Sequence, residues 1–250
     1  FPPVHPAIAE SLTNLSRTLY AGGQFAEAGL MLNQAVQIRE TVLGSTAPEV
    51  AVSLIHLSIV VSQRDLQDSR SLMERALSIL GPLEHDHPLD LAMGLNYYGN
   101  ILRRQGEFAE ARVPLERSLS IRERILGASH PHVARTLSRM GMLEAVTGNY
   151  QSALPLFQRA LRINEASLGA NHAELAGDLN EIGSVHRALG NLAEAKQSFE
   201  RALRIQKSTV GPQHPFVAVT LNALGQLAAQ ANKPEEAESL YQEALAIQEH

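Results

Sequence analysis

Three groups of residues in the middle of the chain have the side chains and the spacing of an anion-binding surface. Arg135, Arg139 and Met142 are spaced i, i+4 and i+7, so they share one face if this segment is helical. Arginine guanidinium groups bind carboxylates and phosphates through paired hydrogen bonds. Two further groups with helical spacing lie before and after the first one, namely Asn96, Asn100, Arg103 and Arg104, and Asn180, Ser184 and Arg187. The sequence therefore predicts a positive strip that binds an acidic ligand, with Tyr97 and Met142 giving apolar contact.

The same arginines have a second interpretation, in which they pair with carboxylates of neighbouring helices. Exposed ion pairs of this kind contribute little to stability and would have no role in binding. Glu181 is the main acidic residue on the same predicted strip. Both interpretations are open at this point.

The elements that carry these residues repeat along the chain. An alanine that follows each His-Pro-type opening recurs at intervals of 42, 41, 42, 42 and 42 residues, and a small residue in the Ala-Leu-x-Ile phrase recurs in step with it. The opening alanines are Ala9, Ala51, Ala92, Ala134, Ala176 and Ala218. Self-similarity at such a period is typical of stacked supersecondary units.

Each repeat has the pattern of two helices. In the fourth copy, His130 and Pro131 open a helix, because proline suits the first helical position. Gly148 and Asn149 end this helix, and a second one runs to Gly169. Each helix has one apolar face, and stacking of the copies would bury these faces.

Small residues recur inside both helices of the repeat. Gly99, Gly141, Gly183 and Gly225 occupy one position of the first helix, although a mid-helix glycine costs about 0.5–1 kcal/mol relative to alanine. We expect a neighbouring helix to approach closely at this position.

Several local features give further expectations. The second repeat lacks a turn glycine near Gln63, and its second helix meets Gly81 and Pro82, so we expect a shorter helix with a bend or looser packing. Pro114 and Pro155 predict mild kinks in two later helices. The histidines that open the repeats are too far apart to share a metal ion, and helix capping is the preferred interpretation; they are His5, His130, His172 and His214.

Longer phrases resemble tetratricopeptide repeats. These are LNALGQLAAQANKPEEAESLYQEALAIQE and LNEIGSVHRALGNLAEAKQSFERALRIQKSTVGPQHPFVA, and the 42-residue period is similar to that of the kinesin light chain type. The resemblance implies an all-α fold, a right-handed α-α superhelix of six stacked antiparallel helix pairs forming a single array over residues 1–250. The repeats are expected at about 5–46, 47–87, 88–129, 130–171, 172–213 and 214–250.

The resemblance also implies where a ligand would bind. In this family the first helices line a concave groove, and ligand contacts come from fixed positions on them. An asparagine at one of these positions often holds the backbone of a bound peptide; Asn96, Asn180 and Asn222 fit it, whereas Ile55 does not. The full set of expected peptide-binding residues is Asn14, Arg17, Asn96, Tyr97, Asn100, Arg103, Arg104, Arg135, Arg139, Met142, Asn180, Ser184, Arg187 and Asn222.

The composition and the absence of known catalytic motifs argue against several classes of function. A net charge of −5 gives no global attraction for nucleic acid or anionic membranes, and 0 cysteines exclude disulfides and thiolate zinc sites. The sequence has no glycine-rich phosphate loop, nucleophile elbow or His-Glu metal helix, so we expect no catalytic residue, metal site or cofactor.

We therefore expect an interaction scaffold that binds a protein or peptide segment, with an acidic peptide favoured. The alternative is a regulatory, sensor or self-assembly region of a larger multidomain enzyme or signalling protein. The chain opens at Phe1, without Met, and no capping helix follows the sixth repeat, so we expect a fragment of a longer protein. We also expect the protein to be a monomer or a weak oligomer and to be located in the cytoplasm.

Overall fold

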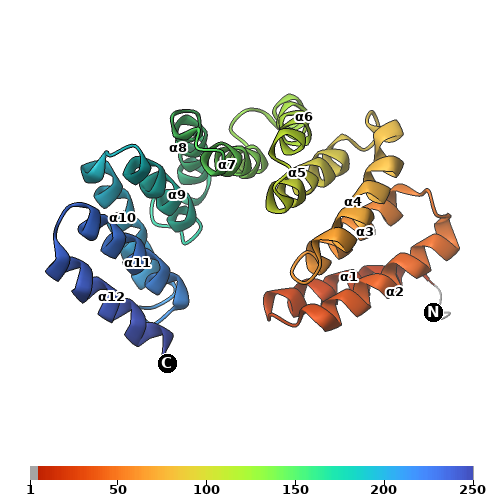
Figure 1. Ribbon diagram of the computed structural model, residues 1–250. Helices are drawn as coiled ribbons and strands as arrows, with labels where there is room; N and C mark the ends of the chain where they lie inside the picture. Colours follow the sequence, from red (N-terminus) through yellow and green to blue (C-terminus); the bar gives the residue numbers. More distant parts are fainter. Residues whose placement is uncertain (1–4, 250) are drawn as a thin grey trace. The chain divides into compact units, whose positions relative to one another are not determined.

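The computed structural model describes residues 5–249, and this part of the chain is all-α, as the sequence predicts (Figure 1). Each expected repeat contributes one helix pair. The helices are α1 (Pro6–Ala21), α2 (Phe25–Leu43), α3 (Pro48–Val61), α4 (Leu66–Leu80), the 3₁₀ helix η1 (Gly81–Leu83), α5 (Pro88–Gln105), α6 (Phe108–Leu126), α7 (Pro131–Val146), α8 (Tyr150–Leu168), α9 (Leu175–Ala188), α10 (Leu192–Thr209), α11 (Pro215–Gln230) and α12 (Pro234–Gln248).

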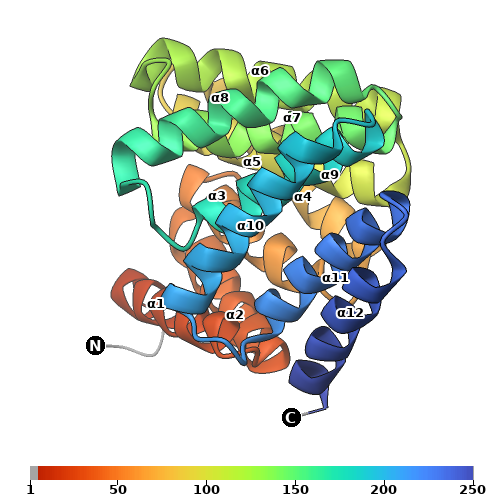
Figure 2. The ribbon, with the colours of Figure 1, turned by 90° about the vertical axis from the view of Figure 1, so that its left-hand side faces the viewer.

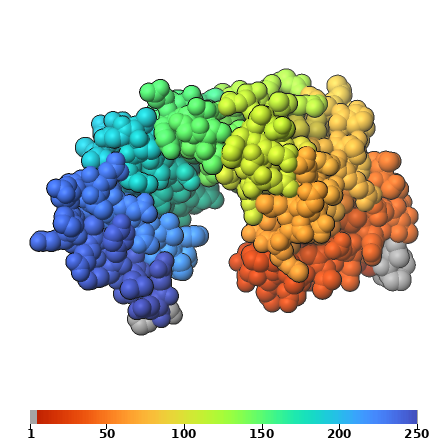
Figure 3. All heavy atoms as spheres, viewed as in Figure 1, coloured from red at the N-terminus to blue at the C-terminus, as the bar shows by residue number. Residues whose placement is uncertain are grey.

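Contacts between helices divide the chain into two compact units, one ending at Gly127 and the other beginning at Ala128. Within each unit, every helix packs on the next one along the chain, and some first helices also contact each other: α3 with α5, α7 with α9, and α9 with α11. Figure 2 shows the helix pairs from a second side, and Figure 3 shows each unit as a closely packed body. The single array over all 250 residues stays a prediction.

Histidines cap three of the first helices, α1, α7 and α11, as the sequence predicts. The Nδ1 atoms of His5, His130 and His214 accept hydrogen bonds from the backbone N–H two residues later, at 3.1, 3.1 and 3.2 Å. Side-chain acceptors at this position satisfy a helix N–H that has no backbone partner. His172 accepts from the N–H of Glu174 at 3.3 Å, but Glu174 precedes α9 and this helix has no side-chain cap, so the expected cap at His172 is wrong.

Three of the second helices, α2, α6 and α8, end on a glycine with positive φ. Gly44, Gly127 and Gly169 have φ values of 89°, 85° and 89°. Residues with a Cβ rarely adopt this conformation, so glycine is required where the chain turns toward the next repeat.

Inside each of the last four pairs, a glycine of the first helix faces a large side chain of the second. A Cβ on Gly141 would lie 2.8 Å from the ring of Phe157, and one on Gly183 would lie 2.7 Å from the ring of Phe199. In the second repeat, Ser58 and Ser69 occupy the corresponding small positions, and their hydroxyl oxygens lie 2.9 Å apart. The close approach predicted from the small residues is confirmed.

The second repeat has the expected short helix but not the expected looser packing. Helix α4 ends at Leu80, and Pro82 lies in η1. Met73 and Leu80 are nevertheless fully buried. Helices α6 and α8 continue past Pro114 and Pro155.

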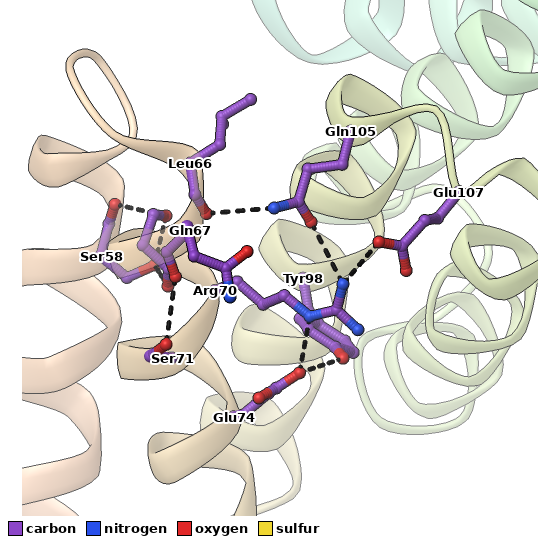
Figure 4. Close-up of polar contacts among 10 residues, drawn as sticks. Ser58, Leu66, Gln67, Arg70, Ser71, Glu74, Tyr98, Gln105 and Glu107 are labelled. Carbon is purple, nitrogen blue, oxygen red and sulfur yellow. Dashed lines mark hydrogen bonds and ion pairs between the residues drawn. The ribbon is translucent and has the colours of Figure 1, made fainter.

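A polar network joins the second repeat to the third (Figure 4). The guanidinium group of Arg70 on α4 donates to Glu74 at 2.8 Å and to Glu107, the N-cap of α6, at 2.6 Å. The hydroxyl of Tyr98 on α5 donates to the same Glu74 carboxylate at 2.9 Å. These contacts hold α4 against the helix pair that follows it.

The glycine contact predicts opposite effects for two alanine substitutions in α9. Gly183→Ala should lower the free energy of unfolding by about 1–3 kcal/mol, because its Cβ overlaps the Phe199 ring. Gly177→Ala is the matched control, since nothing lies within 4 Å of a Cβ there. It should raise that free energy by about 0.4–1 kcal/mol.

Urea unfolding followed by circular dichroism measures both effects. Equal effects of alanine at the two positions would contradict the packing described for Gly183.

Candidate functional site

The expected binding residues of the first unit lie on α1 and α5. Asn14, Arg17 and Arg104 are exposed, and Tyr97, Asn100 and Arg103 are partly buried. Arg103 Nη2 donates to Asn100 Oδ1 at 3.0 Å, so these two side chains hold each other at the surface. Asn96 is 0% exposed, and its amide is therefore not on the surface that could meet a ligand.

The second unit carries the remaining expected residues on α7, α9 and α11. Arg135 is exposed, whereas the others are partly buried, namely Arg139, Met142, Asn180, Ser184, Arg187 and Asn222. Met142 packs against the core cluster that contains Phe157 and Ile182. Because α7 contacts α9 and α9 contacts α11, these residues belong to one layer of neighbouring first helices.

A polar triad joins the fourth repeat to the fifth. Asp178 on α9 accepts a hydrogen bond from Ser138 on α7 at 2.9 Å and another from Asn164 on α8 at 2.7 Å. Burial raises the pKa of the Asp178 carboxyl, the two donors oppose this shift, and the nearby Glu174 adds to it.

An equivalent triad joins the fifth repeat to the sixth. Asn180 Nδ2 on α9 donates to Thr220 Oγ1 on α11 at 2.8 Å, and Thr220 donates to Gln206 on α10, also at 2.8 Å. The amide nitrogen of Asn180 thus bonds within the protein, whereas its buried Oδ1 has no donor among the described residues. Sequence reasoning missed these triads, although a polar residue two places after the landmark alanine, Asp178 or Thr220, was a visible signal.

In the first unit, one histidine occupies the surface position that Tyr97 holds in the third repeat. Burial lowers the pKa of His56, the charges of Arg17 and Arg39 lower it further, and Asp90 opposes them. The imidazole is therefore neutral at pH 7. Arg39 donates to the Ser53 hydroxyl across the boundary between the first and second repeats.

Some charged residues form ion pairs across repeats and others do not. Such pairs occur between second helices, as for Lys196 with Glu236 at 3.0 Å and Lys207 with Glu243 at 2.8 Å. Arg201 similarly pairs with Glu165 at 2.5 Å. Other arginines form no ion pair with any residue of 5–249; these are Arg17, Arg104, Arg135 and Arg187 on first helices and Arg162 and Arg204 on second helices.

Two further findings concern the described residues 5–249. None of their helices has the length and apolar character needed to cross a membrane. They also contain no group of three or more His, Cys, Asp and Glu side chains placed to bind a metal ion.

The Asp178 triad predicts how the stability of the protein depends on pH. The folded state binds a proton at Asp178 more tightly than the unfolded state does, so stability from this group is greatest at low pH and falls as pH rises from about 4, near the unfolded pKa, through the raised folded pKa. Asp178→Asn removes this titration while its amide can still bond to Ser138 and Asn164. The variant should gain stability relative to the wild type between pH 4 and pH 8.

Denaturant unfolding of both proteins across this pH range measures the difference. Asp68→Asn, at an exposed residue of α4, is a control for general changes in charge. A difference between the Asp178 variant and the wild type that stays constant with pH, or shrinks as pH rises, would contradict the raised pKa.

Comparisons with known proteins agree with the fold. The tetratricopeptide repeat model matches residues 7–80, 90–166, 132–208 and 175–250. The structure of BtubC (BKLC) from P. vanneervenii is 20% identical, with a TM-score of 0.74, and the match covers 91% of this chain and 90% of that one. A search of curated proteins returned no match.

Two other solved structures are also similar. The Rap protein complexed with competence and sporulation factor is 14% identical over 95% of this chain and 74% of that one, with a TM-score of 0.67. Kinesin light chain-like repeats from Podosopora anserina are 20% identical over 98% of this chain and 96% of that one, with a TM-score of 0.48. The family matches together span nearly the whole chain, so the chain belongs to the tetratricopeptide repeat family.

Proposed function

We propose that this chain is a non-catalytic scaffold whose first helices bind an acidic segment of a partner protein. Tetratricopeptide repeats support a protein-interaction role in general. The Rap protein, which has a similar fold, has been solved in complex with competence and sporulation factor, and this is consistent with a ligand-holding role for the fold. The acidic character of the partner is inferred from this chain's own side chains.

The observation that carries the proposal is that some arginines of the first helices have no carboxylate partner. Some basic side chains of the second helices pair with carboxylates of neighbouring repeats, as Lys196 does with Glu236. Arg135 and Arg187 on the first helices have no such partner within residues 5–249. A guanidinium group without an internal carboxylate can bind an external one. Arg162 and Arg204 on the second helices also lack an ion pair within residues 5–249, so they give a matched comparison.

The second unit offers the clearest surface for such a ligand. Arg135 lies exposed on α7, and Arg187 lies on the neighbouring α9. The Nε atom of Arg187 is buried and has no hydrogen-bond acceptor within the described residues. A carboxylate that reached this guanidinium group would supply the acceptor, and Ser184, one turn earlier on the same helix, adds a hydroxyl donor.

Removal of the two arginines should weaken binding of an acidic peptide. The probe is a fluorescein-labelled peptide of alternating Glu and Ser, and an otherwise identical peptide of Gln and Ser tests the need for charge. Arg135→Ala/Arg187→Ala should lower the affinity for the Glu peptide about tenfold or more, because losing a hydrogen bond to a charged group costs about 1.5–3 kcal/mol. Fluorescence anisotropy measures the change.

The matched control is Arg162→Ala/Arg204→Ala, which removes two exposed arginines from the second helices α8 and α10. This variant should bind like the wild type. Affinity for the Glu peptide should also fall as salt concentration rises. Equal losses in the two double variants, or equal binding of the Glu and Gln peptides, would refute the proposed acidic ligand.

A further inference from the structure

The second unit has another surface, which is mainly apolar rather than basic. A pocket of about 380 Å³ opens beside the N-terminal parts of α9 and α11 and the C-terminal end of α10. Phe216 and Val219 on α11 line it and are 61% and 58% exposed, and Val210 lines it from the end of α10. Its volume lies within the range of about 300–1,000 Å³ that is usual for ligand pockets. Large apolar side chains that stay exposed together typically mark a binding surface.

Helix α9 contributes Gly177 to the wall of the pocket, and the space beside this glycine is empty. Nothing lies within 4 Å of a Cβ built on Gly177, whereas a Cβ on Gly183 of the same helix would overlap a ring. Packing within the fold therefore explains Gly183 but not Gly177. The corresponding positions of other repeats hold larger side chains, such as Val52, Met93 and Arg135. The missing side chain at Gly177 keeps the pocket open.

Phe216 is also particular to the sixth repeat. The corresponding residue is Glu49, His132 and Glu174 in the second, fourth and fifth repeats. The His214 ring packs against the Phe216 ring, with centroids 4.7 Å apart, so the capping histidine supports the aromatic wall.

The charge at this pocket is negative. Glu174 is the only residue with an ionisable side chain among those that line it, and it forms no ion pair within residues 5–249. Glu174 is close enough to Asp178 to contribute to the raised pKa of that carboxyl, after the larger effect of burial. A second anion would meet repulsion here, whereas a cation beside the pocket would be attracted.

The pocket also contains a hydrogen-bond acceptor that has no donor within residues 5–249. Asn180 lines the pocket, and its Oδ1 atom is buried without a donor among the described residues. Its Nδ2 atom is held by Thr220, which fixes the orientation of the amide. A backbone N–H of a bound peptide is the kind of donor that this oxygen lacks.

We propose that this pocket binds an apolar side chain of a partner peptide that has a lysine or arginine next to it. The apolar side chain covers Phe216 and Val219, and the neighbouring cation faces Glu174. This inference goes beyond the acidic segment proposed above and does not depend on it, because neither Arg135 nor Arg187 lines the pocket.

Short capped peptides on the full 250-residue chain test the proposal by NMR titration. The probes are Gly-Phe-Lys-Gly, Gly-Phe-Glu-Gly and Gly-Ala-Lys-Gly. The Phe-Lys peptide should shift the amide signals of Gly177, Val210 and Val219 in a saturable way. The Phe-Glu peptide should bind about two- to fivefold more weakly, as expected for loss of an exposed charge pair, and the Ala-Lys peptide should give no saturable shift.

Substitutions test whether the peptide binds in the pocket rather than elsewhere on the surface. Gly177→Leu places a side chain in open space, so the chain should fold normally and lose binding of the Phe-Lys peptide by tenfold or more. Glu174→Gln should remove the preference for lysine over glutamate, and Glu194→Gln, at an exposed residue of α10, should leave it intact.

The proposal is overturned if the Phe-Glu peptide binds as well as the Phe-Lys peptide, or if Gly177→Leu leaves the affinity unchanged. Arg135→Ala/Arg187→Ala should not alter binding of the Phe-Lys peptide, and Gly177→Leu should not alter binding of the acidic probe. Failure at one surface can therefore be distinguished from failure at the other.

Discussion

The contact between a glycine of the first helix and a large side chain of the second sets the geometry of the helix pair. In the fourth and fifth repeats, the rings of Phe157 and Phe199 occupy the space that a Cβ at Gly141 or Gly183 would need. Both rings are 0% exposed. With one face of the first helix packed against its partner in this way, other faces are left for neighbouring first helices and for the proposed ligand.

Polar residues make two kinds of contact between the stacked helix pairs. At the boundaries inside the second unit, buried triads centred on Asp178 and Thr220 join each helix pair to the next. Ion pairs between second helices add a further link, as between Arg201 and Glu165. The side chains of Arg135 and Arg187 on the first helices take part in neither set of contacts, and this is the physical basis for proposing a binding surface there.

The sequence predicts the repeating features well because they are local. The period, the helix pairs, the histidine caps of α1, α7 and α11 and the close approach at Gly183 all follow from residue types at fixed spacing. It predicts single side chains less well. Asn96 belongs to the expected ligand set by position, yet it is fully buried in its repeat boundary. The pocket at Gly177 also escaped sequence reasoning, because an exposed glycine and a packed glycine in one helix look alike until their neighbours are known.

The central claim is that ligands meet the first helices while the second helices hold the repeats together. Amide chemical shifts of the labelled chain, recorded with and without the acidic Glu-Ser peptide, test it most directly. The account predicts that the largest changes lie on α7, α9 and α11, around Arg135 and Arg187. Changes concentrated on α8, α10 and α12 would contradict it.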